Sequence, residues 1–515
     1  MAAVTRRQYK GAAAQTTITN ALASGDTSAT LAATTGWPSG TEPFFVVISP
    51  GTASEEKCSA TISGSVLTLT RAQDDTTAQS HASGATIYPV FTADDADEAN
   101  KFASTMTTRG DLVTMDSGPD FARLAVGAKG AVLVTDGSDP KWQAVGSNGT
   151  VLMADSGQTN GVAWSEQSLG YRNVIINGAM QVAQRGTSTA SITSVGYYTA
   201  DRWYTNLTTL GTWTQSVEND GPTGSGFRKS LKMLCTTADA SPAAGDALFF
   251  QNRIEGQNVQ QFFKGTSSAK QFTVSFWVKS NVTGTFIVEV ADADNSRQTS
   301  KSYTVDVADT WEKKTVVFAA DTTGAFDNDN AFSLALNFHL GAGTNYTSGT
   351  LQTTWASIVT ANRAVGQTNL AAATNNYWQI TGVQLEAGAV ATPFEFEDYG
   401  TTLAKCQRYY CKISGSYLGS GLAYSTTGTT ILVKFPTTMR VAPTAVETSG
   451  TASSFLQVLS NTGTQVCNVV PFFQRANAES AEIAATSAST GLTQGNATFI
   501  LAATGAVYVA FSAEL

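Results

Sequence analysis

Aromatic and polar side chains that could bind sugar are the chemically most informative residues of this chain. The sequence holds 9 Trp and 15 Tyr. A flat aromatic ring stacks on the CH face of a pyranose, and amide, carboxylate or guanidinium groups beside it bond the hydroxyls. Both kinds of residue occur in the middle of the chain, as Trp203, Tyr204, Trp213, Tyr303, Trp311, Tyr346, Trp355 and Trp378 with Asp201, Arg202, Asn252 and Gln379. This set predicts carbohydrate binding.

The surroundings of these aromatics separate surface candidates from core candidates. The residues that we expect to contact a glycan are Trp213, Tyr346, Trp355 and Trp311, of which the first three lie in or beside glycine- and threonine-rich segments. Trp277 and Trp378 lie inside alternating strand patterns. Most tryptophans in such patterns belong to a core, so we expect these two to be buried.

Carboxylates gather near the end of the same region and raise an enzymatic alternative. Glu386, Glu395, Glu397 and Asp398 lie within a short stretch, and paired carboxylates hydrolyse glycosidic bonds when they flank the bond at a set distance. Sequence spacing does not establish that geometry. The chain has only 2 His and lacks a G-x-S-x-G elbow, a phosphate-binding loop and an H-E-x-x-H helix. We expect no enzymatic activity.

Two acidic groups could be taken for calcium sites. Asp327 and Asp329 stand in an Asp-Asn-Asp-Asn run and offer oxygen ligands, although an Asx turn gives the same pattern. The acidic residues at 94–98 lack the spacing of a calcium loop, and acidic residues in the first turn of a helix complement its dipole. We expect no cofactor, with structural calcium at Asp327 and Asp329 as the alternative.

Composition and charge exclude several classes of function. A net charge of −9 with few charged residues, 14%, argues against binding nucleic acid, and the basic group Arg6, Arg7 and Lys10 resembles a solvated terminus. No apolar run is long enough for a membrane span, and a signal-peptide pattern is missing. The 5 Cys are odd in number and irregularly spaced, which fits synthesis in a reducing cytoplasm.

The pattern of residues along the chain predicts an all-β protein of several domains. Short β-branched and aromatic runs alternate with glycine-rich turns, and 515 residues exceed what one core holds. We predict an N-terminal β domain at 1–93, a connecting helix at 94–107, a repeat neck at 108–168, a two-sheet jelly roll at 169–400 and a C-terminal β-sandwich at 401–515.

The neck consists of an internal repeat. Residues 126–142 and 145–164 share a V-G-x-x-G-x-V-L pattern that ends in tryptophan. One such unit is too short to bury its apolar side chains, so neighbouring copies or chains must cover them. The triplet at 109–111 reads Arg-Gly-Asp, which we interpret as the opening of the repeat and not as a cell-adhesion signal.

Five segments in a fixed order carry a family resemblance. They are N-G-A-M-Q-V-A-Q-R-G at 177–186, A-D-R-W at 200–203, F-W-V-K-S at 276–280, W-Q-I-T-G-V-Q-L-E-A-G at 378–388 and T-P-F-E at 392–395. The set resembles the carbohydrate-binding-module-like jelly roll of bacteriophage tail fibres and tail spikes, over roughly residues 169 to 410. The resemblance implies that Asp201, Arg202 and Trp203 form a structural corner in which the aspartate pairs with the arginine.

Other parts of the chain resemble phage fibres too. The I-Y-P-V segment at 87–90, before an acidic helix, is similar to tail-proximal regions, and the repeat is similar to slender trimeric shafts. These resemblances imply an elongated parallel homotrimer, made in the host cytoplasm and assembled into the virion tail. Its N-terminus would attach to tail or adaptor proteins, and its distal β-sandwiches would recognise host surface polysaccharide. The alternatives are a virion scaffold or decoration fibre without glycan binding, and a polysaccharide-degrading tail spike.

Overall fold

The computed structural model describes residues 13–115, 121–147, 150–166, 170–459, 463–503 and 507–515. The protein is all-β, with 44% of residues in strands and 8% in helices, as the sequence predicts. The chain divides into two compact units, Met1–Gln167 and Ser168–Leu515. The basic group Arg6, Arg7 and Lys10 lies outside the described residues.

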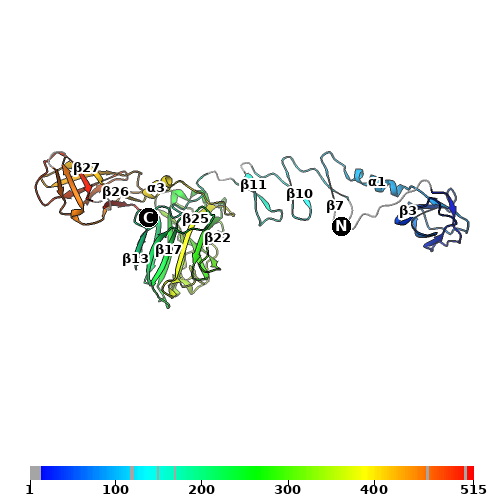
Figure 1. Cartoon of the computed structure of the whole chain (residues 1–515), viewed down its shortest axis with the longest axis horizontal. Coiled ribbons are helices and arrows are strands. Elements are labelled where there is room, and N and C mark those ends of the chain that lie inside the picture. The colour runs from blue at the N-terminus through cyan, green and yellow to red at the C-terminus, as the bar shows by residue number, and fades with distance from the viewer. Residues whose placement is uncertain (1–12, 116–120, 148–149, 167–169, 460–462, 504–506) are drawn as a thin grey trace. The chain divides into compact units, whose positions relative to one another are not determined.

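The first unit opens with one antiparallel sheet of six strands (Figure 1). Its spatial order is β1-β6-β3-β4-β5-β2. The apolar side chains of alternate positions, such as Phe44, Val46 and Ile48, enter a small core with Trp37. The strands are β1 (Thr16–Thr17), β2 (Ser28–Thr30), β3 (Gly40–Ile48), β4 (Glu56–Ser63), β5 (Val66–Gln73) and β6 (Thr86–Pro89).

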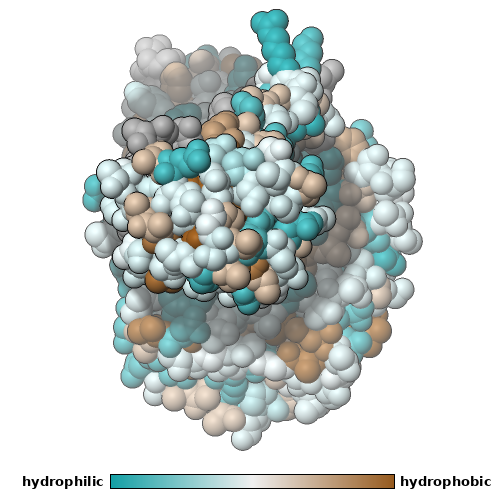
Figure 2. All heavy atoms as spheres, turned by 90° about the vertical axis from the view of Figure 1, so that its right-hand side faces the viewer, coloured by the Kyte–Doolittle hydropathy of each residue, from teal (hydrophilic) through white to brown (hydrophobic). Residues whose placement is uncertain are grey.

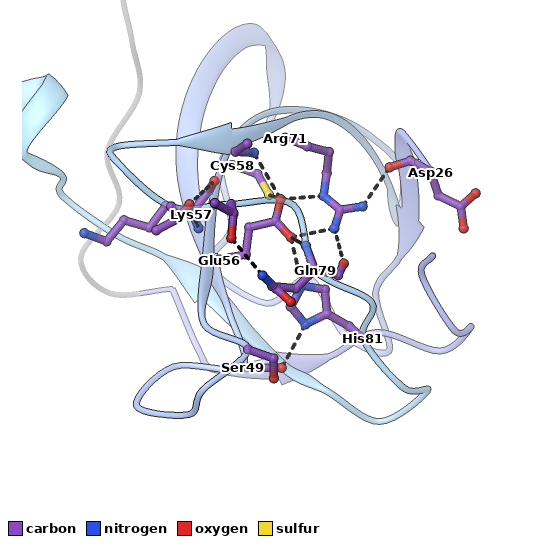
Figure 3. A network of polar contacts seen from close by, with 12 residues as sticks. Asp26, Ser49, Glu56, Lys57, Cys58, Arg71, Gln79 and His81 are labelled. Carbon is purple, nitrogen blue, oxygen red and sulfur yellow. Dashed lines mark hydrogen bonds and ion pairs between the residues drawn. The ribbon is translucent and has the colours of Figure 1, made fainter. Parts of the chain in front are cut away.

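A buried carboxylate is the polar centre of this sheet (Figure 3). Glu56, fully buried, accepts hydrogen bonds from Arg71 Nε at 2.7 Å, the Gln79 amide at 2.9 Å and the Ala72 amide at 3.0 Å, and contacts His81 Nε2 at 3.0 Å. Burial alone would raise the pKa of Glu56, but the bonds from Arg71 and the other donors outweigh it and lower the pKa to about 2.

Helix α1 (Ala93–Thr105) follows the sheet. Thr92 caps it by accepting a hydrogen bond from the Asp95 amide, and Asp95 bonds the Thr92 amide in return. Asp94 and Asp95 stand in the first turn, where negative charge complements the helix dipole. The interpretation of this acidic group as a helix start is confirmed.

Three separate two-stranded hairpins form the repeat region. Trp142 Nε1 donates to the Ala125 carbonyl at 2.7 Å, and Trp164 Nε1 donates to the Ala144 carbonyl at 2.7 Å. Each indole also packs on the glycine of its V-G pair, where a Cβ would lie within 2.6 Å of the ring. The hairpins are β7 (Leu112–Met115) with β8 (Phe121–Leu124), β9 (Val132–Thr135) with β10 (Pro140–Gln143), and β11 (Thr150–Ala154) with β12 (Val162–Glu166).

These hairpins leave apolar side chains in solvent. Within the described part of 108–166 no cluster of buried hydrophobic residues forms. The large exposed side chains are Leu112, Met115, Phe121, Val126, Val132, Leu133 and Val145. Asp111 of the Arg-Gly-Asp triplet is only 5% exposed and binds Arg123 Nε at 2.6 Å, so it serves the first hairpin.

The second unit begins with a sandwich of two antiparallel sheets (Figure 1). The six-stranded sheet has the order β13-β16-β17-β25-β19-β22, and the seven-stranded sheet has the order β14-β15-β18-β23-β20-β21-β24. The strands are β13 (Ser188–Ile192), β14 (Gly196–Tyr197), β15 (Trp203–Thr208), β16 (Thr212–Glu218), β17 (Ser230–Thr237), β18 (Ala247–Glu255), β19 (Phe272–Ser280), β20 (Gly284–Asp292), β21 (Arg297–Val305), β22 (Glu312–Phe318), β23 (Phe332–Ala342), β24 (Ala356–Ser357) and β25 (Tyr377–Ala387). Short helices in its loops are η1 (Gly256–Asn258), η2 (Gln260–Phe262), α2 (Thr344–Thr347), η3 (Thr360–Asn362) and η4 (Leu370–Ala372).

Stacked aromatic rings fill the core between these sheets. Trp203 lies parallel to Phe250 with ring centroids 4.9 Å apart, and Trp378 lies 5.8 Å from Phe338. Both indoles are fully buried. The predicted burial of Trp378 is therefore confirmed, and such aromatic pairs add to the stability that area burial alone gives.

A C-terminal sandwich completes the second unit. A sheet of order β26-β35-β29 packs on a seven-stranded sheet of order β31-β30-β34-β27-β28-β33-β32. Helix α3 (Tyr399–Gln407) leads into β26 (Tyr410–Ser414), β27 (Tyr417–Ala423), β28 (Gly428–Lys434), β29 (Glu447–Thr448), η5 (Ala452–Ser454), β30 (Phe455–Leu459), β31 (Gly463–Val466), β32 (Phe472–Ala476), β33 (Ser480–Thr486), β34 (Ala497–Ala502) and β35 (Tyr508–Ser512).

Buried charges join the two sandwiches. Arg202, 1% exposed, pairs with Glu514 and lies over the Tyr409 ring at 3.5 Å. The prediction that Asp201 pairs with Arg202 is wrong, because the Asp201 carboxylate accepts hydrogen bonds from Gln184. Burial raises the pKa of Asp201 to about 6 despite those bonds. The expectation that Asp201, Arg202 and Trp203 are structural agrees with their burial.

The face drawn in Figure 2 is mostly white and teal, with smaller brown patches between them. All five cysteines are buried free thiols. Among the described residues, none of the helices has both the length and the hydropathy needed to span a bilayer.

We expect Glu56→Gln to destabilise the first unit by about 2 kcal/mol at neutral pH, allowing for solvent screening, and to make its stability less sensitive to acid than that of the wild type. The depressed pKa of Glu56 means that its contribution is present above pH 4.5 and is lost as the pH falls toward 2. Hydrogen exchange in β4 and β5, corrected for intrinsic rates, measures this loss. Glu55→Gln is the control, and equal acid sensitivity in both variants would refute the assignment.

Candidate functional site

The outer face of the six-stranded jelly-roll sheet carries an aromatic side chain that the sequence placed in the core. In β19, Phe276 and Val278 face the core, so Trp277 and Lys279 between and beyond them face outward. Trp277 is half-buried and outside the core cluster. The expectation of a buried Trp277 is therefore wrong.

Trp311 lies on the neighbouring strand at the same end of the sheet. It directly precedes β22, in which Lys313 pairs with Trp277. Along the strand direction the two tryptophans are therefore about 7 Å apart, and their strands are neighbours in the sheet, about 4.8 Å apart. Trp311 is half-buried, and Lys279 Nζ lies 5.2 Å from the centre of its ring.

Polar groups surround the Trp311 ring. Its Nε1 donates to Asp220 Oδ1 at 3.3 Å, and Asp220 also forms an ion pair with Lys279. Gln379 Nε2 donates to Ser230 Oγ at 3.3 Å and lies 3.5 Å from Asp220 Oδ2. Burial would raise the pKa of Asp220, but Lys279 and Trp311 outweigh that effect and lower it, so the carboxylate is charged at neutral pH.

A tyrosine extends this surface across β25. Tyr377 is half-buried, its hydroxyl donates to Asp309, and Lys232 Nζ lies 4.5 Å from the centre of its ring. Lys232, Gln379 and Lys279 pair across three adjacent strands, so they form one row. We call the surface made by Trp277, Trp311, Tyr377, Asp220, Lys232, Lys279 and Gln379 the aromatic platform.

The aromatic platform combines the two elements that sugar recognition needs. Three half-buried rings offer faces or edges to CH groups, while the Asp220 carboxylate and the ammonium groups of Lys232 and Lys279 can bond hydroxyls. Gln379 is only 3% exposed and supports Asp220 from beneath. Asp220 remains 42% exposed, which leaves it accessible to a ligand. Of the residues predicted to contact a glycan, the structure places Trp311 here and the other three elsewhere.

Trp213 lies in the core. It is fully buried in β16, and its Nε1 donates to the Leu210 carbonyl at 2.7 Å. The prediction that Trp213 contacts sugar is therefore wrong. Strict alternation in β16, with Trp213, Gln215 and Val217 inward, is a signal that could have identified it.

Tyr346 and Trp355 belong to the long connection 343–376. Trp355 packs on Phe272 with ring centroids 5.4 Å apart, and its Nε1 donates to the Ala319 carbonyl at 2.8 Å. The Tyr346 ring lies 5.9 Å from the guanidinium of Arg363. Both are half-buried, and neither joins the aromatic platform.

This connection covers the opposite sheet. Arg363 forms two hydrogen bonds of 2.8 Å to Glu289, which is fully buried and also contacts His339 Nε2 at 3.0 Å. Burial would raise the pKa of Glu289, but Arg363 and His339 lower it far below its usual range. The outer face of the seven-stranded sheet is thus anchored under its own loop. On the six-stranded sheet, the end that carries Trp277, Lys279 and Tyr377 is partly exposed, whereas Gln384 and Glu386 at the other end of β25 are buried.

The four carboxylates that raised an enzymatic alternative have structural partners. Glu386 accepts hydrogen bonds from Thr392, and Glu395 accepts one from the Asn173 amide at 2.8 Å. Glu397 pairs with Lys405, and Asp398 caps α3 through the Thr401 amide at 3.0 Å. These contacts hold the exit of the jelly roll and the start of α3.

A serine, a histidine and a glutamate form a chain of contacts in the first unit (Figure 3). Ser49 Oγ lies 3.0 Å from His81 Nδ1, and His81 Nε2 lies 3.0 Å from Glu56. Hydrolase triads have this composition. Here Arg71 neutralises the glutamate, and Pro50 after the serine has no amide hydrogen for an oxyanion. The contacts stabilise the sheet.

The predicted calcium ligands are exposed, and Asp329 closes an Asx turn by accepting from the Ala331 amide at 2.9 Å. In the described part of the chain, no group of three or more acidic, histidine or cysteine residues is arranged to hold a metal. The turn interpretation therefore holds for Asp329.

A cage of oxygen atoms nearby is filled by an ammonium group. Lys264 Nζ, fully buried, lies 2.5 Å from Asp292 Oδ2, 3.1 Å from Asp321 Oδ2, 3.0 Å from the Thr323 carbonyl and 2.6 Å from the Gly324 carbonyl. A hard cation would take the same kinds of ligand. Lys264 therefore supplies the positive charge that these oxygens require.

Comparisons with known proteins find likeness among solved structures alone. No family model and no curated protein matches the chain. The enzymatically active domain of bacteriophage CBA120 tailspike protein 4 is similar with a TM-score of 0.23 and 18% identity, over 42% of this chain and 22% of that chain. TmCBM61, solved with beta-1,4-galactotriose, has a TM-score of 0.23 and 9% identity, over 42% of this chain and 99% of its own. The CBM22-1–CBM22-2 tandem domain of Paenibacillus barcinonensis Xyn10C has a TM-score of 0.21 and 11% identity, over 68% and 100%. Likeness at this level does not establish a shared function.

We expect Lys264→Met to lower the stability of the second unit by about 3 to 5 kcal/mol, because it leaves Asp292 and Asp321 buried without their ammonium partner. Differential scanning calorimetry of the full chain measures the loss. The exposed Arg228→Met is the control. Unchanged melting in Lys264→Met, or a wild-type protein whose melting temperature falls on adding a chelator, would contradict the role of Lys264.

Proposed function

We propose that this chain is a phage tail fibre that recognises host surface glycan without degrading it, and that the aromatic platform is its glycan site. The observation that carries the proposal is the outward position of Trp277 beside Trp311, with the exposed carboxylate of Asp220 bonded to the Trp311 indole. A pyranose can stack its CH face on such tryptophans and bond its hydroxyls to the polar groups beside them.

We further propose that the fibre is a parallel homotrimer. An isolated two-stranded hairpin is at best marginally stable in water, and three of them follow one another between 112 and 166 with apolar side chains exposed. Neighbouring copies would cover those side chains. In this arrangement the N-terminal sheet attaches to tail or adaptor proteins, and the protein is made in the host cytoplasm and carried on the virion.

A polysaccharide-degrading spike is the second candidate function, and a scaffold fibre is the third. Glycoside cleavage needs two carboxylates free to act on one bond. Glu386, Glu395, Glu397 and Asp398 instead hold backbone amides, hydroxyls or Lys405, which supports binding over cleavage.

Truncating either platform tryptophan should weaken glycan binding. For Trp277→Ala and Trp311→Ala we expect affinity to fall at least about tenfold, which corresponds to about 1.4 kcal/mol of lost stacking. The melting temperature should stay close to that of the wild type because both rings are half-buried outside the core. Biolayer interferometry on a panel of purified bacterial capsular polysaccharides and lipopolysaccharides measures the affinity.

Tyr399→Ala is the matched control, since this exposed tyrosine lies away from the platform in α3. Unchanged affinity in both tryptophan variants would refute the platform as the site. If the wild type binds none of the panel, the scaffold function is favoured, and if it releases oligosaccharides from a bound polymer, the degrading function is favoured.

The full chain should have a solution mass of three times 53.9 kDa by light scattering. Deleting residues 108–165 should reduce the affinity of this association, because the exposed hairpin side chains are then missing. A monomeric full chain would overturn the trimer, and an equally tight trimer after the deletion would overturn the role of the hairpins.

A further inference from the structure

Two segments far apart in the sequence enclose a small hollow at the exit of the jelly roll. One is the turn at 177–181, and the other is the segment 394–397 after β25. We call this space the exit hollow. In the turn, the Gly178 carbonyl accepts a hydrogen bond from the Val383 amide at 3.0 Å. Because Val383 follows Tyr377 by six positions in β25, the exit hollow lies about 20 Å along the strand from that end of the aromatic platform.

The turn that lines the exit hollow has a fixed shape. Asn177 has a φ of +61° and Met180 a φ of +56°, so both are left-handed. The Asn177 side chain holds this conformation: its Nδ2 donates to the Val182 carbonyl at 2.8 Å and to the Asp201 carbonyl at 3.0 Å, and its Oδ1 accepts from the Val182 amide at 3.0 Å. The turn is therefore shaped before any ligand binds, which lowers the cost of binding one.

This turn leaves hydrogen-bond donors without a partner. Gly178 and Ala179 are buried, yet within the described part of the chain their amides donate to no acceptor. Buried backbone N–H groups are rarely left unpaired, so these two require a water or a ligand atom as acceptor. The side-chain amide of Gln181, which is half-buried, likewise has no hydrogen-bond partner among the residues that the structure describes.

The exit segment adds an acceptor and an apolar wall. Oε2 of Glu395 accepts from a backbone amide at 2.8 Å, whereas its Oε1 has no donor among the described residues. The charge of Glu397 is paired with Lys405. The rings of Phe394 and Phe396 meet edge to face with centroids 4.9 Å apart, and Phe396 is 53% exposed. The exit hollow thus combines N–H donors, a carboxylate oxygen and phenyl rings.

The size and the mixed polarity of the exit hollow limit what it can hold. Its volume is about 380 Å³ when the space open to solvent is included, but the centre of a water-sized sphere can occupy only about 20 Å³ of it. That is room for the tip of a small group and not for a sugar ring. A cation would face the amides of Gly178 and Ala179, and an anion would face Glu395. A neutral group that both accepts and donates hydrogen bonds avoids both conflicts.

We propose that the exit hollow binds the acetamido group of an N-acetylated amino sugar in the host glycan. The carbonyl of this group accepts from the Gly178 and Ala179 amides, and its N–H donates to Glu395. Its methyl packs on Phe396, and Gln181 bonds a hydroxyl of the same sugar. A sugar hydroxyl alone lacks the methyl that the phenyl wall accommodates. The proposal rests on the glycan-binding function proposed above and adds to it a second site, which selects the class of sugar.

Saturation-transfer difference NMR of the full chain with free N-acetylglucosamine tests this site. We expect the acetyl methyl to receive the strongest saturation, and glucose and glucosamine, which lack the acetamido group, to bind at least about tenfold more weakly. Gln181→Ala and Phe396→Ala should each weaken binding at least about fivefold, because each removes one contact. Gln494→Ala and Phe263→Ala are the matched controls, since they change exposed residues of the same two types outside the exit hollow.

The outcomes separate this site from the proposed function. A wild type without an acetyl-methyl signal, or one that binds glucose equally well, would overturn the acetamido assignment, while the polysaccharide panel still tests the aromatic platform. A signal lost in Trp277→Ala but kept in Gln181→Ala and Phe396→Ala would place the sugar on the platform and also overturn it. Both hollow variants should melt close to the wild type, because Gln181 has no partner and Phe396 is more than half exposed. If Phe396→Ala melts lower, Gln181→Ala decides alone.

Discussion

A tryptophan is stable in a core when its indole N–H donates to a hydrogen-bond acceptor there. Two buried tryptophans of this kind set the register of the jelly roll. Trp203 donates to the Asn177 carbonyl at 3.1 Å, and Trp378 donates to the Tyr303 hydroxyl at 3.1 Å. Because Trp378 faces the core, its neighbour Gln379 is on the outer face of β25. Lys279 of β19 pairs with Gln379, so it is on the outer face too. The outward position of Trp277, two residues earlier, follows. The aromatic platform is therefore a consequence of core packing.

Local pattern is sufficient to predict the closing strand. Apolar and polar residues alternate along 377–388 with a slip of one residue at Gly382, which is the pattern of a strand with a bulge. The structure has this bulge: the pairing of β25 with β19 shifts register there, and Gly382 has a φ of +62°. The Phe227 ring lies 2.6 Å from where a Cβ would stand, so glycine is required. The fold class, the helix start and the repeat were likewise readable from composition and short-range spacing.

The residues of the site were harder to predict, for a physical reason. Phe276, Trp277 and Val278 are three apolar residues in a row, so alternation alone does not predict which of them faces outward. The pairing of their strand with β25 and β22 determines which side chains face outward. In contrast, Trp213 belongs to a strict alternation that its glycine-rich surroundings obscured. Periodicity identifies strands reliably, whereas the face of an ambiguous residue depends on partners far along the chain.

The link between the two sandwiches depends on such distant partners too. Arg202 meets Glu514, which lies 312 positions later, and Arg408 forms two hydrogen bonds to Glu255. Removing one member of a buried pair leaves an uncompensated charge and costs several kcal/mol. Separating the two sandwiches would therefore cost several kcal/mol.

This link between the sandwiches matters for a site built on a sheet face. A pocket buries most of a small ligand, whereas a platform contacts one side of it, so a single platform binds weakly. In the proposed trimer, three platforms engage one polymer, and linkage raises the overall affinity by a factor on the order of 10² to 10⁴ only if their geometry permits simultaneous contact. A flexible joint between the platforms and the trimeric part of the fibre would reduce that gain. The buried ion pairs between the sandwiches are thus what would let a shallow sugar site, repeated three times, hold a particle on a cell surface.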